Sequence, residues 1–262
     1  SPETIAVTFA KTSRSPESFK DIADELTETK SAEFHEKWVV GYGHSSVAEH
    51  AILHIAIENI SRLAIEPLEA NRLASYTEKS SRYQKWETDS FHIPAELTNH
   101  PLQPKYVETC QKLFVFYKTA LEAVRNVVAE SNPRKEGESA GAWEQRIRAK
   151  YADSCRYILP ASAVANVGVT INARALEHAL CKMLSHPLEE VRQIGADIQV
   201  VAQNTVPTLV KYVCPKTFYQ TIQEDFLQST RSIPIPHAAQ QDWFRLVHYD
   251  EASDKNIIAA AL

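Results

Sequence analysis

Hydroxyl and charged side chains alternate in SYTEKSSRY, residues 75–83. Serine hydroxyls and backbone N–H groups donate hydrogen bonds to phosphate oxygens, and arginine adds a permanently charged fork with two parallel donors. Glu78, Ser80 and Arg82 therefore suit a loop that holds the phosphate and the base of a nucleotide. A solvated turn with Tyr83 and Trp86 directed inward explains the same residues, so spacing alone leaves both interpretations open.

A second group of basic residues lies in NARALEHALCK, residues 172–182. Arg174, His178 and Lys182 recur at four-residue intervals, so on a helix they share one side. Glu177 is the only carboxylate close to them in the sequence, which leaves the stripe short of negative charge. Either an anion covers this stripe or its three side chains face water.

Two histidines, His50 and His54, have the spacing of metal ligands on a helix. A zinc hydrolase of the HExxH type needs a glutamate directly after the first histidine, and Ala51 occupies that place. We therefore expect no metal site. The sequence also lacks the GxSxG, GxxxxGK and GxGxxG patterns and has only six glycines, which excludes the common phosphate loops.

Composition limits the partners and the compartment. The net charge of −5 gives no overall attraction for DNA or RNA, so a small anion held by a local patch is a better candidate than a nucleic acid polymer. Four cysteines without CxxC spacing indicate neither a zinc ribbon nor a disulfide framework and favour a reducing, cytoplasmic setting. No apolar run is long enough to span a bilayer, and no secretory leader is recognisable.

The elements that must position these residues are mostly helices. Apolar periodicity and turn residues predict helices within 15–26, 31–43, 103–130, 143–160, 172–184 and 187–213, loops over 87–104 and 131–142, and a strand over 162–171. A further helix is expected from about 46 to 65, because polar residues recur every fourth position between aliphatic ones, with Pro67 stopping it.

The ends of the chain suggest a longer parent. The sequence begins without methionine and stops in NIIAAAL, so either it is a piece of a longer protein or its last segment docks on its own core. We expect one domain over 1–215 and a C-terminal extension over 216–262 that leads into a further domain of that parent.

Three ordered motifs together resemble the flavin-dependent thymidylate synthases. That family carries a GHxSxxEH element, an RHRxxSxNExSxRY signature and an NARxLxxxL helix, and here GHSSVAEH spans 43–50, NRLASYTEKSSRY spans 71–83 and NARALEHAL spans 172–180. CRYILP at 155–160 and SHPLEEVRQ at 185–193 resemble two further family segments. The resemblance covers roughly residues 5 to 215.

The resemblance implies a helix-rich α/β (α+β) fold with a small twisted sheet, assembled as a homotetramer whose active sites lie between protomers or paired with a second homologous domain. It implies FAD as the cofactor, dUMP as the nucleotide, methylenetetrahydrofolate as the one-carbon donor and NADPH as the reductant. In this chemistry the cofactor carries the difficult steps and the protein supplies positioning and charge.

Residue roles follow by position. The nucleotide would be held by Glu78, Ser80, Arg82 and, from a neighbouring subunit, Arg156. Flavin-contacting positions correspond to His44, Ser46, Asn71, Arg72, Asn172, Arg174 and His178. The catalytic candidates are Arg72 and Lys182.

Departures from the family pattern fall mainly on the flavin and ring side. The RHR triplet is reduced to Ala70, Asn71 and Arg72. The family's pyrimidine-facing arginine aligns with Met183, or with Lys182 if a deletion lies just upstream, and lysine lacks the planar fork. Two hypotheses follow: an active synthase of dUMP or a related uridine nucleotide, or a catalytically degenerate nucleotide-binding or structural subunit of the same fold.

Overall fold

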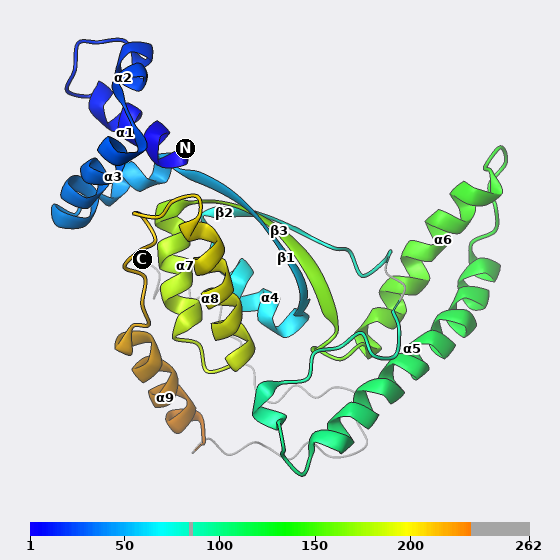
Figure 1. Cartoon of the computed structure of the whole chain (residues 1–262). Helices are drawn as coiled ribbons and strands as arrows, with labels where there is room; N and C mark the ends of the chain where they lie inside the picture. The colour runs from blue at the N-terminus through cyan, green and yellow to red at the C-terminus, as the bar shows by residue number, and fades with distance from the viewer. Residues whose placement is uncertain (84–85, 232–262) are drawn as a thin grey trace, which may run out of the picture. The chain divides into compact units, whose positions relative to one another are not determined.

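The computed structural model describes residues 1–83 and 86–231. The chain divides into two units, Ser1–Gln220 and Thr221–Leu262, and the first contains all the elements that concern the site. The expected extension over 216–262 lies outside the described residues from 232 onward. The α-helices of the described residues are α1 Pro2–Thr12, α2 Phe19–Glu25, α3 Glu28–Phe34, α4 Arg62–Glu69, α5 Gln103–Ser131, α6 Ala140–Cys155, α7 Ala173–Leu184, α8 Glu189–Gln203 and α9 Thr217–Arg231 (Figure 1).

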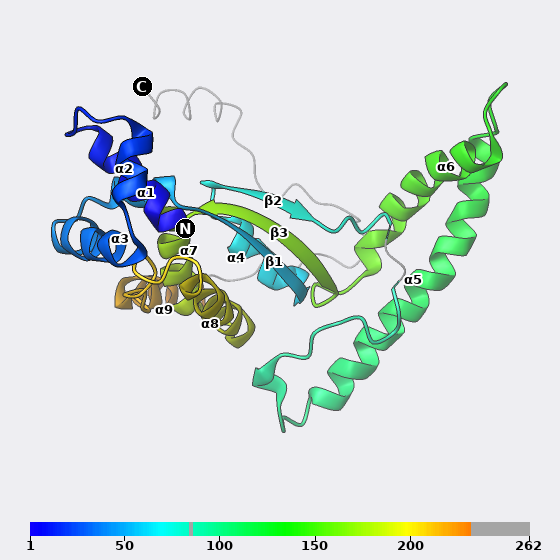
Figure 2. The same cartoon turned by 45° about the horizontal axis from the view of Figure 1, so that its top comes forward.

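Short helical turns complete this set: a π-helical segment His35–Gly41 and 3-10 turns Ser45–His50, Ala95–Leu97 and Arg156–Ile158. The strands are β1 Ile52–Ser61, β2 Ala74–Glu78 and β3 Val164–Asn172. All pairings are antiparallel in the order β1-β3-β2, so the strand latest in the sequence is central (Figure 2). The expected α/β (α+β) fold, rich in helix with a small sheet, is confirmed.

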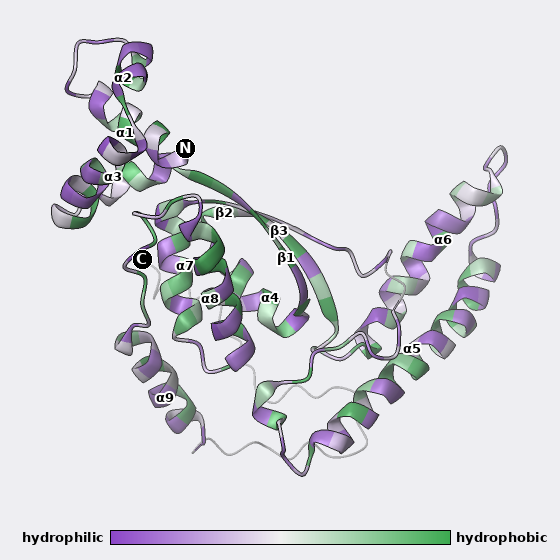
Figure 3. Cartoon of the chain, in the orientation of Figure 1, coloured by the Kyte–Doolittle hydropathy of each residue, from purple (hydrophilic) through white to green (hydrophobic). Residues whose placement is uncertain are grey.

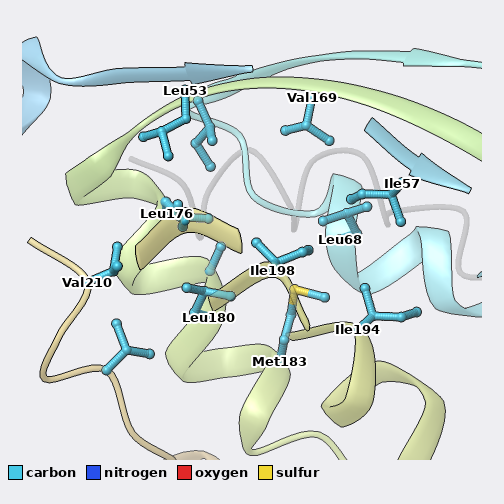
Figure 4. Packing of buried hydrophobic residues seen from close by; sticks show 14 of the residues in the cluster. Leu53, Ile57, Leu68, Val169, Leu176, Leu180, Met183, Ile194, Ile198 and Val210 are labelled. Carbon is cyan, nitrogen blue, oxygen red and sulfur yellow. The ribbon is translucent and has the colours of Figure 1, made fainter. Parts of the chain in front are cut away.

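Helices cover one face of the sheet and form the main core there. Hydrophobic residues run along β1 and β3 (Figure 3). Side chains from these strands meet those of α4, α7 and α8 in a close-packed layer (Figure 4). Leu180 and Met183 are almost completely buried in it. The opposite face is polar, where His54 Nδ1 lies 2.9 Å from Thr170 Oγ1.

The expected helix over 46–65 is wrong. Residues 45–50 form a 3-10 turn, 52–61 form β1, and only 62–69 are α-helical, with Pro67 inside α4 instead of after it. A spacing of four residues is even, so polar side chains four apart share a face of a strand as well as of a helix. The β-branched isoleucines of β1 and its pairing with β3 decide for the strand.

Two smaller expectations also change. Residues 74–78, treated above as loop, form the edge strand β2, and α8 ends at Gln203, ten residues before the predicted end. The strand at 164–172 and the helices at 103–131, 140–155 and 173–184 confirm their predictions.

Helices α5 and α6 pack against each other as a hairpin. Arg125 pairs with Glu144 at 2.6 Å, and Trp143 Nε1 donates to the Asn132 carbonyl at 2.8 Å. A second, smaller core lies at the base of this hairpin, formed by Trp86, Phe114, Tyr117, Cys155 and Ala163. Within residues 1–83 and 86–231, none of the helices combines the length and the apolar composition that a bilayer crossing requires.

Candidate functional site

A cavity of about 670 Å³, called here the basic cavity, lies along α7. The turn after α4 supplies Ala70–Leu73, α7 supplies the basic stripe, and the 3-10 turn before β1 supplies Glu49. Its lining includes Arg72, Asn172, Arg174, His178 and Lys182. Three segments that are far apart in the sequence thus converge on one hollow, and six of the predicted site residues meet there, since Asn71 also lines it.

The stripe on α7 arises from simple helix geometry. Asn172 is the N-cap of α7, and its Oδ1 accepts a hydrogen bond from the Ala175 N–H at 2.9 Å. Starting the helix there places Arg174, His178 and Lys182 on the cavity side and Leu176 in the core. The predicted stripe is confirmed.

The negative charge beside the stripe comes from Glu49 rather than from Glu177. Glu49 forms a salt bridge with Arg174, and both side chains are about half exposed. Glu177 remains the only carboxylate close to the stripe in the sequence, but the 3-10 turn brings a second acid, Glu49, to α7. An exposed pair of this kind contributes little to stability, which leaves Arg174 available for an anion.

Asn71 was predicted as a flavin contact, yet all its side-chain hydrogen-bonding groups have internal partners. Asn71 is buried; its Nδ2 donates to the Pro67 carbonyl at 3.2 Å and to the Leu68 carbonyl at 2.8 Å, while its Oδ1 accepts from Lys182 Nζ at 2.8 Å. It closes the end of α4 and holds the Lys182 ammonium at the cavity wall.

Tyr76 supports the same turn from β2. Its hydroxyl donates to the carbonyls of Asn71 at 2.7 Å and Leu68 at 3.0 Å. Burial raises the pKa of Tyr76, and the charge of Glu69 raises it further, so the hydroxyl keeps its proton at neutral pH.

The two alignments of the family's arginine can now be distinguished by exposure. Met183 is 1% exposed and packs in the core between α7 and α8, while Lys182 lines the basic cavity. Of the two, only Lys182 is placed to meet a ligand.

His44 and Ser46 line a different hollow. This second cavity, of about 550 Å³, lies among α1, α2, the π-helical segment and the 3-10 turn, and Arg14 stacks over the Trp38 ring at 5.4 Å there. Glu49 borders both cavities. The structure therefore separates His44 and Ser46 from the six predicted site residues of the basic cavity.

The predicted nucleotide contacts gather near the end of α6. Arg82 Nε donates to Asp153 Oδ1 at 2.8 Å, and Arg156 Nε lies 3.4 Å from the same oxygen. The hydrogen bond from Arg82 holds the pKa of Asp153 below its usual range. Ser80 Oγ accepts from the Arg82 N–H at 3.4 Å. Within a single chain, Arg156 already lies beside Arg82.

A cavity of about 410 Å³ adjoins this group and is lined by Arg62, Ser81, Arg156, Tyr157, Leu159, Pro160 and Ala161. Arg62 Nη1 donates to Glu78 Oε1 at 2.7 Å, so Glu78 is paired at the rim of this hollow. Arg62 is the first residue of α4, where the helix dipole disfavours a cation. A partner at Glu78 and an anionic ligand would both offset that cost.

Sequence reasoning missed Arg62, Asp153 and the pairing role of Glu49. Arg62 was read as one member of a polar helix stripe, and Asp153 belongs to no motif. The signal for Glu49 was present, since it belongs to the GHSSVAEH element.

The histidine pair does not form a metal site. His50 ends the 3-10 turn and stacks on Phe9 with 5.0 Å between ring centroids, whereas His54 lies in β1. Among residues 1–83 and 86–231, no three His, Cys, Asp or Glu side chains are placed to hold a metal ion.

A three-stranded antiparallel sheet covered by helices on one face, with cavities lined by basic residues, defines an α+β protein. Residues 1–208 match the family described as thymidylate synthase complementing protein (Thy1). The chain belongs to this family, and the resemblance noted from the three motifs is confirmed.

Two relatives show how the chain compares in length. It is 28% identical over 222 residues to a flavin-dependent thymidylate synthase of Clostridium tetani, covering 82% of this chain and 83% of that protein. It is 29% identical over 214 residues to a UPF0159 protein of Chlamydia muridarum, covering 79% of this chain but only 40% of that protein. The chain thus spans less than half the length of the chlamydial relative.

Solved structures share the fold. The flavin-dependent thymidylate synthase ThyX of Helicobacter pylori, complexed with FAD and dUMP, aligns with a TM-score of 0.50 at 22% identity over 82% of this chain and 96% of that one. The UMP/dUMP methylase PolB of Streptomyces cacaoi, bound with 5-Br dUMP, aligns with a TM-score of 0.55 at 16% identity over 80% and 88%.

Proposed function

We propose that this chain is a flavin-dependent thymidylate synthase homologue that binds FAD and catalyses reductive methylation of dUMP or a related uridine nucleotide. Methylenetetrahydrofolate would donate the one-carbon unit and NADPH would reduce the flavin. The observation that carries the proposal is the convergence of Arg72, Arg174, His178 and Lys182 on one cavity. Membership of the family and the names of the relatives support it.

The basic cavity fits the anionic part of FAD. Arg72, Arg174 and Lys182 face a single carboxylate, Glu49, so the cavity carries excess positive charge. A diphosphate needs such charge, and guanidinium forks bind its oxygens with two parallel hydrogen bonds. We assign Arg72 and Arg174 to the diphosphate, with Asn172 and His178 as neighbouring polar contacts. Bound flavin would supply the reducing equivalents.

Lys182 is the candidate for meeting charge that develops on a pyrimidine ring. Its ammonium is fixed by Asn71 at 2.8 Å, so it is oriented before a ligand arrives. Arg82, Arg156 and Ser80 would bind the nucleotide phosphate, while Glu78, held by Arg62, would contact the nucleotide from the rim. His44 and Ser46 would approach the flavin from the second cavity.

A second function, a catalytically degenerate subunit, is favoured by a specific observation. The positions where the family has further arginines hold Ala70 and Lys182, whose ammonium lacks the planar fork, and losing a transition-state donor costs about a hundredfold to a thousandfold in rate. The chain would then complete a site only with another chain, as a homotetramer or with a second homologous unit. Its free cysteines suit a reducing cytoplasm.

The test is flavin uptake followed by turnover. The purified chain is incubated with FAD, desalted and examined for a flavin spectrum, which should bleach with NADPH and return when dUMP and methylenetetrahydrofolate are added. Arg72→Gln and Arg174→Gln should each weaken FAD binding about tenfold, since a hydrogen bond to a charged group contributes about 1.5–3 kcal/mol. Lys112→Gln, an exposed change on α5 far from the cavity lining, is the matched control.

The outcomes separate the two functions. FAD uptake with turnover supports the synthase. FAD or dUMP binding without turnover, in a chain that stays folded, supports the degenerate subunit. A folded chain that takes up neither FAD nor dUMP rejects the synthase, and it also rejects the degenerate subunit if adding a second homologous chain restores neither binding.

A further inference from the structure

A third hollow, called here the hairpin cavity, lies between the α5–α6 hairpin and the segment that follows β2. Its volume is about 260 Å³. It is lined by Arg82, Trp86, Glu87, Tyr117, Lys118, Leu121, Arg148, Tyr151 and Ala152. It shares no lining residue with the basic cavity. The functions proposed above leave all of these residues except Arg82 without a role.

One residue that lines this cavity, Trp86, has a buried indole donor without a partner in the described part of the chain. Trp86 is only 5% exposed, and its buried Nε1–H has no hydrogen-bond partner among the described residues. An indole nitrogen can only donate, and a buried donor without an acceptor is destabilising. A ligand with an acceptor atom would satisfy it.

The charges around the hollow favour an anion. Lys118 Nζ donates to Glu87 Oε2 at 3.1 Å, which neutralises the only carboxylate among the described lining residues. Arg82 is paired with Asp153. Arg148 is half-buried and forms no salt bridge among the described residues. Its charge acts on Glu144, one turn away on α6, but that carboxylate is already paired with Arg125, so the guanidinium of Arg148 keeps donors for a ligand.

Tyr117 adds a further donor beside Arg148. It is 3% exposed, and burial raises its pKa, so the hydroxyl remains protonated at neutral pH. Leu121 and Ala152 give the cavity an apolar border. The combination of buried donors, an arginine that forms no salt bridge among the described residues and an apolar border is typical of a ligand pocket.

We propose that the hairpin cavity binds a small oxyanion, a phosphate or a carboxylate, through the Trp86 indole N–H and the Arg148 guanidinium. The volume lies below the roughly 300–1,000 Å³ of pockets for drug-sized ligands, so the ligand is smaller than a nucleotide. Arginine binds both kinds of oxyanion with two parallel hydrogen bonds. The site is independent of the flavin, and its test needs neither FAD nor dUMP.

The experiment follows the indole N–H resonances of the ¹⁵N-labelled full chain. Trp86→Phe assigns the Trp86 signal, and Trp143, whose N–H already donates to Asn132, is the internal reference. Inorganic phosphate and benzoate are titrated separately at constant ionic strength, with chloride as the balancing ion. We expect a saturable downfield shift of the Trp86 signal with at least one of them.

Variants on α6 make the assignment specific. Arg148→Gln should weaken the binding at least about tenfold, because it removes a charge-assisted hydrogen bond. Arg148→Lys should recover part of the affinity by keeping the charge. Lys150→Gln removes the same charge from an exposed position of the same helix outside the cavity and should leave the affinity within about twofold.

The two titrations distinguish the ligand classes and can overturn the proposal. A shift with phosphate alone assigns a phosphate ligand, and one with benzoate alone assigns a carboxylate. If neither anion moves the Trp86 signal, or if the shift is undiminished in folded Arg148→Gln, the proposal is overturned.

Discussion

Replacing Asn71 by alanine should destabilise the fold more than it weakens FAD binding. The change removes the two bonds from Nδ2 to the carbonyls of Pro67 and Leu68 and leaves the Lys182 ammonium without its acceptor. A net hydrogen bond contributes about 1 kcal/mol, and one to a charged group about 1.5–3 kcal/mol. Since Lys182 is only half-buried, we expect a total loss of about 3 kcal/mol.

Urea unfolding measures this loss. With a slope of about 2 kcal/mol/M, the midpoint of Asn71→Ala should fall by about 1.5 M. Lys182→Met and the double variant complete a cycle, in which the pair should show a coupling free energy of about 1 kcal/mol. Arg72→Gln, which lines the same cavity, serves as the comparison for FAD binding.

The result that would refute this reasoning is the opposite pattern. If Asn71→Ala unfolds at the wild-type urea concentration, shows no coupling with Lys182 and loses FAD affinity as strongly as Arg72→Gln, then Asn71 contacts the flavin directly. The role of Asn71 in positioning Lys182 would then be wrong.

Two further predictions concern packing and charge. In Gly195→Ala the new Cβ would lie 3.0 Å from Met183 Cβ, so the free energy of unfolding should fall by about 1–3 kcal/mol. Gly141 has open space around it, so Gly141→Ala should raise the free energy of unfolding by about 0.5–1 kcal/mol. If urea unfolding shows that Gly195→Ala is more stable than wild type, the packing of α7 on α8 is contradicted. The hydrogen bond from Arg146 lowers the pKa of Glu138 to about 2, so the stability it contributes is present above about pH 4.5 and disappears as the pH falls toward 2. The difference in melting temperature between wild type and Glu138→Gln should therefore shrink over that range, and a constant difference would rule the ion pair out as its source.

Helices whose ends are marked by local capping residues were predictable from the sequence, whereas strands β1 and β2 were not. Asn172 caps α7 within its own turn, so the start of that helix is determined locally. Strand β1 depends on pairing with β3, more than a hundred residues later. Since the histidine and glutamate at positions 54 and 58 share a face in either conformation, only the partner strand decides the outcome.

The candidate site was likewise predictable only where it depends on local sequence. The stripe of Arg174, His178 and Lys182 follows from helical spacing, and the structure gathers it in one cavity. The partners that set the charge of the site, Glu49 for Arg174 and Asp153 for Arg82, come from other segments. Pairing between distant segments leaves no local pattern in the sequence. The role of Asn71 and the charge balance of the site could therefore be recognised only from the structure.

That charge balance differs between the two proposed binding regions. In the basic cavity three cations face one carboxylate, which leaves charge for a diphosphate. In the nucleotide region Arg62 is paired with Glu78, and Arg82 and Arg156 share Asp153, so little positive charge is left over. A nucleotide phosphate must therefore displace Asp153 from Arg82 or receive a cation from another chain or unit. On the proposed assignments, the basic cavity thus has surplus positive charge for a diphosphate, whereas the nucleotide region needs a further cation for a phosphate.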